Sequence, residues 1–483
     1  MNRYFRKLQN RHPDSDIRKR GGITVFLTMV LFILMGVVMK VVSETRQYAV
    51  KTEGECMANI GMDSCFAEYN RELLDRYDLF FIDLTYGGEK PSIGKFCKHL
   101  EGYLKANLAD NDSSLWRERD FLNMELSSVK IEEYHIASDD NGRDVHNQAV
   151  DYMKDLYGIS LVEGALADFG ILRENRFDVT DMEKEAETIR SEIGGEYEEL
   201  SSIGMPADIS EDMSGGILPM VMRDPGELSD KVTNLSDLSS NRNLVSGYGA
   251  YTEDEGISLT DDALFTEYLL DKCGFYRSEN EDGALDYEAE YILCGKNNDI
   301  ANLNFVLNRI FMIRWAADAA YIFTDSEKCN EAEIAATAFS LVIEEPQATP
   351  YVKDLLLIGW AFAEALSDTK RIYRGGRVPI LKTYSDWRMT LTGVMNGEYS
   401  EPDISGEKGL LYKDYLRFLL LLQNKEEKTM RFMDVIEMNL RKTQGNAYFR
   451  IDGCVSAVKA NIEICGMDGD MVDITKEYSY FGK

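Results

Sequence analysis

Histidine is scarce in this sequence, and the few histidines are not spaced for metal chemistry. None of the four lies in an HExxH motif or at another close metal-binding spacing. Cys97 and His99 are two residues apart, but nothing nearby completes a zinc set. The sequence therefore predicts neither a metal centre nor a bound cofactor. The histidines are His12, His99, His135 and His146.

Other motifs that carry chemistry are missing as well. The chain has no GxxxxGK[ST] loop for a nucleotide, and no GxSxG or SxxK motif stands in a convincing context. Neighbouring acids at 132–133 and 344–345 can be proposed as an acid and base, but chance pairs are expected among 84 acidic residues. Residues 374–377, Arg-Gly-Gly-Arg, follow an expected helix and so favour a C-cap over a phosphate turn. We predict no catalytic residues.

Cysteine is too sparse for a disulfide scaffold, with eight residues in 483. The even count is compatible with some pairing outside the cell. Cys56 and Cys65 are nine residues apart, which places them on opposite faces of one helix, where they cannot bridge each other. Cys273 and Cys294 lie near the ends of expected strands, and we predict that they pair.

Basic residues are in deficit, with 53 Lys and Arg against 84 Asp and Glu and a formal net charge of −31. The first 20 residues are the exception, since seven basic and two acidic side chains give +5. Subtracting this +5 and the +1 of Lys40 leaves −37 on residues 41–483. Such a charge repels nucleic acid and anionic headgroups, so we expect no nucleic-acid partner. Solubility alone also explains an acidic surface.

Long uncharged apolar runs are limited to one. Residues 21–39 contain no charge and follow the basic head directly. This length is close to the roughly 20 residues that cross a bilayer as a helix. Because Lys and Arg collect on the cytoplasmic side, Arg18, Lys19 and Arg20 predict a cytoplasmic N-terminus and an exported remainder. We therefore predict a single-pass protein of the cell membrane, with a cytoplasmic head over 1–20 and a transmembrane helix over 21–42.

The start of the apolar run allows three interpretations. A cleaved secretory signal is disfavoured by the long apolar core and by the poor cleavage site at residues 41–43. An uncleaved anchor fits better. Lys19-Arg20-Gly21-Gly22 also resembles the leader of type IV pilin-like proteins, in which a peptidase cuts after Gly, so Gly21 and Gly22 are the candidate cleavage residues. Those proteins usually carry Glu at the fifth mature position, where this chain has Leu27 or Phe26.

The segment after the span predicts a membrane-proximal unit over 43–140. Residues 43–77 lack proline and carry apolar side chains at three- and four-residue steps, which indicates an amphipathic helix. Residues 78–86 follow as a buried strand that Gly87-Gly88 ends, and a second strand is expected over 128–135. Helix followed by strand is the layout of pilin-like proteins, although a stalk helix that docks on its own domain gives the same pattern.

The rest of the chain predicts two further regions and an α+β fold that is rich in helix. Residues 141–260 comprise a helical pattern over 145–200 and a stretch rich in Ser, Gly, Asp and Asn, which we interpret as a linker. Residues 261–483 form the C-terminal α+β domain. Its expected elements are a strand over 285–293, a core helix over 303–323, helices near 331–343, 350–372 and 411–441, and a strand over 447–464.

Several stretches resemble one family. They are Arg20–Thr28, Ser43–Arg46, Phe66–Leu74, Tyr77–Asp83, Tyr287–Gly295, Asn302–Leu303 with Arg309–Arg314, Trp360–Glu364, Gly375–Lys382 and Tyr412–Leu416. The family they resemble is an uncharacterised group of single-pass proteins from Gram-positive anaerobes, whose members tend to be encoded beside tight-adherence (Tad-type) pilus genes. The N-terminal third is also similar in layout to the TadE and TadG minor pseudopilins. The resemblance implies no established activity and no catalytic residues.

The leading functional prediction is a non-enzymatic component of the cell envelope, a minor pseudopilin-like or accessory protein of a Tad-type pilus or secretion system. It would act through packing of the helix over 23–39, where Gly36 allows a second helix to approach closely. The expected partners are membrane lipid and pilus or envelope proteins. The alternatives are a membrane-anchored extracellular enzyme, such as a wall hydrolase, and an extracellular ligand-binding module.

Overall fold

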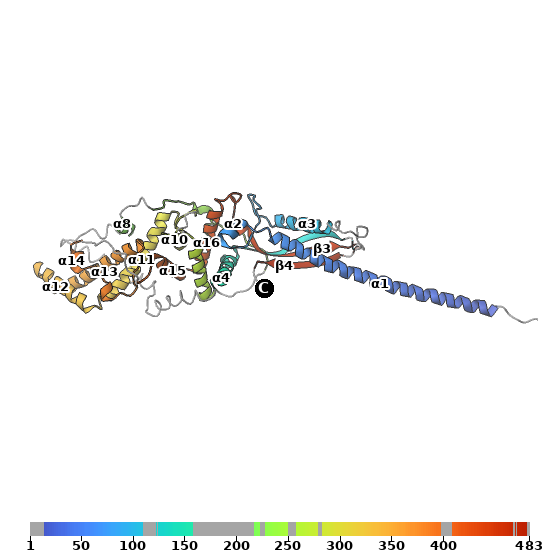
Figure 1. The fold of residues 1–483 in the computed structure, drawn as a ribbon, viewed down its shortest axis with the longest axis horizontal. Helices are drawn as coiled ribbons and strands as arrows, with labels where there is room; N and C mark the ends of the chain where they lie inside the picture. The colour runs from blue at the N-terminus through green and yellow to red at the C-terminus, as the bar shows by residue number, and fades with distance from the viewer. Residues whose placement is uncertain are drawn as a thin grey trace, which may run out of the picture. The chain divides into compact units, whose positions relative to one another are not determined.

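The computed structural model describes residues 14–109, 122, 124–157, 217–222, 228–249, 257–278, 283–397, 408–466, 469 and 471–480. Residues 1–13, most of the expected helical pattern over 145–200 and much of the expected linker lie outside the described residues. The described chain is rich in helix and contains a small sheet, which confirms the α+β prediction (Figure 1).

Two compact units make up the chain, and each combines segments that are distant in the sequence. Unit 1 consists of Met1–Glu68, Ser92–Tyr134 and Ala457–Ser479. Unit 2 consists of Tyr69–Pro91, His135–Ser456 and Tyr480–Lys483. Neither unit is therefore a continuous stretch of sequence.

Unit 1 is built on the long first helix, α1 (Asp14–Phe66). The C-terminal half of α1 packs on α3 (Ile93–Ala109) and on strand β4 (Met471–Ser479) (Figure 1). Strand β3 (Cys454–Cys465) pairs with β4 in antiparallel fashion, with Ile462 opposite Ile474, and also pairs with β2 (Glu125–Ile136). The strands expected over 128–135 and 447–464 are thus confirmed as β2 and, in a shorter form, β3.

The amphipathic helix expected to reach Tyr77 is interrupted, and this prediction was wrong at its end. α1 stops at Phe66, and a separate helix α2 (Arg71–Tyr77) begins after Asn70. The Asn70 side chain accepts a hydrogen bond from the Leu73 amide at 3.1 Å, which caps the new helix. Apolar periodicity continues through the break, so it does not reveal the cap.

The strand expected over 78–86 is reduced to two residues, β1 (Ile82–Asp83), which pair with Val455 and Cys454 in unit 2. Its neighbours Leu79, Phe81 and Leu84 are nevertheless buried, as predicted for this apolar segment. Gly87 has a φ of +77°, which only a residue without Cβ adopts readily, and the chain turns there.

Helices form most of unit 2. The central pair is α11 (Asp299–Ile322) and α13 (Thr349–Tyr373), and α12 (Ser326–Val342) packs on α13. Side chains around the whole of α11 are buried, which confirms the core helix expected over 303–323. Within the described residues, unit 2 also contains α2 and the helices α4 (Arg143–Tyr157), α8 (Leu218–Val221), α9 (Leu259–Lys272), α10 (Glu288–Cys294), α14 (Leu391–Met395), α15 (Tyr412–Leu422) and α16 (Lys425–Leu440).

Two related predictions for unit 2 were wrong, one for a strand and one for a disulfide. The expected strand over 285–293 is the helix α10, which Gly295 ends with a φ of +68°. A short buried apolar run fits a strand and a helix equally well, so periodicity did not decide. Cys273 and Cys294, expected to form a disulfide near strand ends, are both free thiols and lie at the C-terminal ends of α9 and α10.

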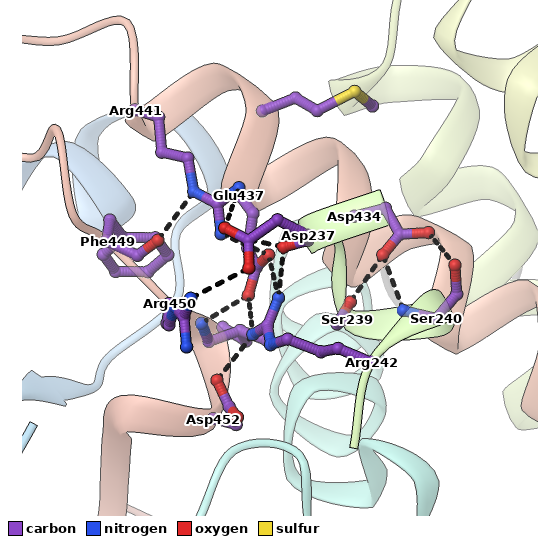
Figure 2. Close-up of polar contacts among 12 residues, drawn as sticks. Asp237, Ser239, Ser240, Arg242, Asp434, Glu437, Arg441, Phe449, Arg450 and Asp452 are labelled. Carbon is purple, nitrogen blue, oxygen red and sulfur yellow. Dashed lines mark hydrogen bonds and ion pairs between the residues drawn. The ribbon is translucent and has the colours of Figure 1, made fainter. Parts of the chain in front are cut away.

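Part of the polar stretch expected as a linker, residues 228–249, is held on α16. Arg242 donates to both carboxylate oxygens of Glu437, at 2.5 and 2.7 Å, and to Asp452 at 2.5 Å (Figure 2). One turn away, Asp434 accepts hydrogen bonds from the Ser239 hydroxyl at 2.7 Å and from the amide and hydroxyl groups of Ser240 at 2.9 and 2.5 Å. This segment is therefore fixed by charged and polar contacts with a helix.

Candidate functional site

The N-terminal half of α1 is a bare apolar helix. Residues 22–42 are all exposed, and the side chain of Phe32 is 83% exposed. This is one helix long and apolar enough to cross a membrane, and its most apolar stretch is not buried in the protein. Burying one large apolar side chain away from water is worth about 1.5–3 kcal/mol, so this surface strongly favours lipid or protein over water.

A polar side chain within the bare half, Thr28, is satisfied by the helix itself. The Thr28 hydroxyl donates to the main-chain oxygens of Thr24 and Val25, at 3.0 and 2.9 Å. This matters because an unsatisfied polar group in hydrocarbon costs several kcal/mol. Threonine is thus compatible with a lipid-facing position here.

The glycines of α1 serve two different surfaces. A Cβ added at Gly36, and likewise at Gly22, would meet no described atom within 4 Å. A Cβ added at Gly54 would instead lie 2.7 Å from the Ile474 side chain, and one at Gly61 would lie 2.9 Å from the Leu104 side chain. The inner glycines therefore allow close docking within unit 1, whereas the outer ones leave open helix surface.

The C-terminal half of α1 docks in unit 1 through one stripe of small and medium side chains. Val50, Gly54, Ala58, Met62 and Cys65 recur at steps of four or three residues and are buried. The stripe ends in an aromatic cluster. The ring of Phe66 lies 4.4 Å from that of Tyr478 and 6.0 Å from that of Phe96, measured between centroids.

The residues flagged by metal-like spacing do not converge in unit 1. Cys97 lies 3.5 Å from the main-chain oxygen of Val129, whereas His99 faces Glu68, with 3.0 Å between Nδ1 and a carboxylate oxygen. Tyr103 donates to the same Glu68 at 2.7 Å, and this hydrogen bond raises the pKa of Tyr103 to about 12. Among the described residues, no group of three His, Cys, Asp or Glu side chains is placed to hold a metal ion.

Unit 2 brings together a serine, a histidine and an aspartate that the sequence did not single out as a group. The Ser456 hydroxyl donates to Asp144 at 2.5 Å, and Nδ1 of His135 lies 3.2 Å from the same oxygen. The Ser456 hydroxyl also lies 3.3 Å from the main-chain oxygen of His135. A nucleophilic triad needs the serine hydroxyl to donate to the imidazole. Here the carboxylate receives it, so the group fits a role in fixing the main chain.

The predicted leader and orientation residues lie at the start of α1. The backbone of Arg18, Lys19, Arg20 and Gly21 is helical, and the side chains of the three basic residues are not described. Gly22 and Gly36 are described, and both are exposed. Their assigned roles in cleavage, orientation and helix packing stay predictions.

Comparison with known proteins gives a family but no activity. A family model described as a family of unknown function (DUF5702) matches residues 196–466, which is more than half of the 483 residues. No curated protein matches the chain, and no solved structure matches it. The match starts after α1 and ends just past β3.

Proposed function

Because the chain belongs to the DUF5702 family of unknown function, its role has to be inferred from its own structure, and we propose that it is a single-pass cell-envelope protein that assembles with other proteins through α1. The observation that carries the proposal is the continuity of α1. One unbroken helix joins an open apolar half to a half that docks on a sheet and a second helix in unit 1.

A continuous helix can couple assembly in the membrane to the rest of unit 1. At about 1.5 Å per residue, 53 residues extend over roughly 80 Å, and no proline interrupts the helix after residue 14. Rotation or packing of the apolar half is therefore transmitted directly to unit 1. A plain anchor needs only apolar length, whereas an assembling helix also needs a place where a partner helix can come close.

The finer assignment to a minor pseudopilin-like or accessory protein of a Tad-type pilus extends this proposal. It is supported by the sequence resemblance and by the layout of unit 1, in which a long N-terminal helix packs on an antiparallel strand pair. In this proposal the N-terminus is cytoplasmic, the rest of the chain is extracellular, and the partners are lipid and envelope proteins. This architecture acts by binding and does not depend on a catalytic centre.

Photocrosslinking in the native cell tests the assembly step. Phe32 lies one helical turn from Gly36 on the same face of α1, so a photoreactive residue at 32 reports on helices that approach Gly36. We expect crosslinks to another envelope protein with an apolar N-terminal helix. Gly36→Leu should reduce their yield severalfold, because the added side chain separates the helices.

Two controls make the result decisive. A photoreactive residue at Met62, which is buried in unit 1, should give no crosslinks to other proteins. Val38→Leu changes an exposed aliphatic side chain close to Gly36 and should leave the yield unchanged. Crosslinks from position 32 to lipid alone would show a plain anchor and contradict the proposal.

The leader hypothesis has a separate test. Mass spectrometry of the protein from its own cells should find a mature N-terminus at Gly22 or Ile23 if a pilin-type peptidase acts after Gly21 or Gly22. A chain that begins at residue 1 excludes leader processing. It leaves the assembly role to the crosslinking result.

A further inference from the structure

A hollow of about 360 Å³ in unit 2 reverses the charge balance of the chain. The chain has 53 basic and 84 acidic residues, but four of the six charged residues that line the hollow are basic, a local balance of 4 − 2 = +2. The volume falls within the roughly 300–1,000 Å³ typical of small-molecule sites. The charged lining residues are Asp368, Arg371, Lys382, Asp386, Arg388 and Lys408.

One wall of the hollow is a loop that follows α13 and is held by a buried arginine. Arg314 of α11 is fully buried, and its guanidinium donates to the main-chain oxygens of Pro379 and Ile380, at 2.9 and 3.0 Å. Its Nε donates to Asp368 of α13 at 3.0 Å. The loop is thus tied to the two central helices, which holds this wall of the hollow in place.

A second buried cation in the lining of the hollow is Lys382, which three carboxylates hold in place. The side chain of Lys382 is 1% exposed, and its Nζ lies 2.5 Å from Glu364, 2.7 Å from Asp368 and 3.4 Å from Asp318. Glu364 also accepts a hydrogen bond from the amide of Arg388 at 3.1 Å. The main chain that presents the Arg388 side chain is therefore held by a buried carboxylate.

Both acidic residues of the lining already have partners within the protein. Asp368 is bonded to Arg314 and Lys382. Asp386 accepts from the amide and the hydroxyl of Thr383, at 2.8 and 2.6 Å, and these hydrogen bonds lower the pKa of Asp386. Lys382 is matched by three carboxylates, so the charge of the lining depends on Arg371, Arg388 and Lys408 against Asp386.

We propose that this hollow binds the oxyanion group, a phosphate or a carboxylate, of a small ligand. Arginine suits this chemistry because its planar fork matches both groups, and Arg371 and Arg388 both line the hollow. Lys408 is exposed at the rim and adds a charge that attracts an anion from solution. The inference rests on unit 2 alone and is independent of the role proposed for α1.

Trp387 provides a local reporter for binding. It directly precedes Arg388, and its ring centre lies 5.2 Å from Nζ of Lys382 and 4.9 Å from Nζ of Lys328. A change in the field of the hollow should therefore alter tryptophan fluorescence.

The test is a titration of the full-length protein, in detergent, with inorganic phosphate at constant ionic strength, where chloride replaces phosphate. Calorimetry and tryptophan fluorescence are both recorded, and acetate is titrated in a parallel arm. We expect saturable binding of phosphate, of acetate or of both. Saturation by phosphate alone identifies a phosphate group, and saturation by acetate alone identifies a carboxylate.

Variants place the site. Lys408→Gln and Arg388→Gln should each weaken binding about tenfold, as expected for loss of one charged hydrogen bond or ion pair. The control is Lys353→Gln, which removes a cation that pairs with Glu333 on α12 and does not line the hollow. Lys408 is exposed, so its variant tests binding without a change in the core. The proposal is overturned if neither anion gives a saturable signal, or if Lys408→Gln binds as tightly as Lys353→Gln.

Discussion

Arg242 joins a polar loop to α16 through ion pairs with buried carboxylates. Its partner Glu437 is fully buried, and Asp452 is 3% exposed (Figure 2). Burial alone would lower the pKa of Arg242, but the hydrogen bonds and charge of Glu437 raise it, so the guanidinium stays charged. Two buried carboxylates around one arginine make this contact sensitive to loss of the cation.

The residue-scale prediction is that Arg242→Ala lowers the free energy of unfolding by about 3–5 kcal/mol, because it removes the cation that pairs with buried Asp452 and leaves buried Glu437 with Arg441 alone. Urea unfolding of the full-length protein, followed by circular dichroism, measures the change. The control is Arg450→Ala, which removes an exposed ion pair with Asp237 and should cost at most about 1 kcal/mol. Equal losses in the two variants would show that burial of the partners does not matter.

Single residues also show what the sequence can and cannot reveal. The C-cap at Gly375, which has a φ of +85°, was predicted, because a glycine that follows a helical pattern has a local meaning. The network of Arg242 was not predicted. Its partners Glu437 and Asp452 are 195 and 210 positions away in the sequence, and no local pattern joins them.

At the scale of elements, α1 places glycine on two surfaces with different neighbours. Gly54 lies against Ile474 and Ile464 of the β3–β4 pair, and a side chain there has no room. Gly36 has open space around it. The same substitution at the two positions therefore separates folding of unit 1 from association through the apolar half.

We predict that Gly54→Val destabilises the protein by about 1–3 kcal/mol, because added methyl groups overpack a filled interface. Gly36→Val should leave the unfolding free energy within about 0.5 kcal/mol and reduce only crosslinking through α1. Urea unfolding and the crosslinking yield are measured on both variants. Reversed effects would mean that the docked and open halves of α1 have been misassigned.

Element prediction succeeded where a pattern was long and failed where it was short. The run that became α11 is apolar on all sides over six turns, so its place in the core could be read directly. The run over 285–293 is shorter than three helical turns, and strand and helix fit it equally. Strand β4 was missed although Val472, Ile474 and Tyr478 lie at alternate positions, because Lys476 interrupts the apolar pattern.

For the whole molecule, the assignment to two units depends on contacts that sequence composition does not report. Unit 1 needs strand β4 from the C-terminal end to pack on α1 from the N-terminal end. Local periodicity can at best identify α1 and β4 as separate elements, and it does not show that they pack on each other. The basic hollow of unit 2 was missed for the same reason, since Arg371, Arg388 and Lys408 meet only after folding.

Cys56 gives a direct measure of the proposed orientation. It is the exposed cysteine of the chain, and it lies on α1 beyond the apolar half, whereas the other seven thiols are buried or partly buried. If the body is extracellular, a membrane-impermeant maleimide should label Cys56 on intact cells, and Cys56→Ser should remove most of the signal.

Adding Ser15→Cys in that background places the only readily exposed thiol in the cytoplasmic head, where labelling should require permeabilised cells. Labelling of Cys56 only after permeabilisation would contradict export, and labelling at residue 15 under neither condition would indicate that the head has been removed.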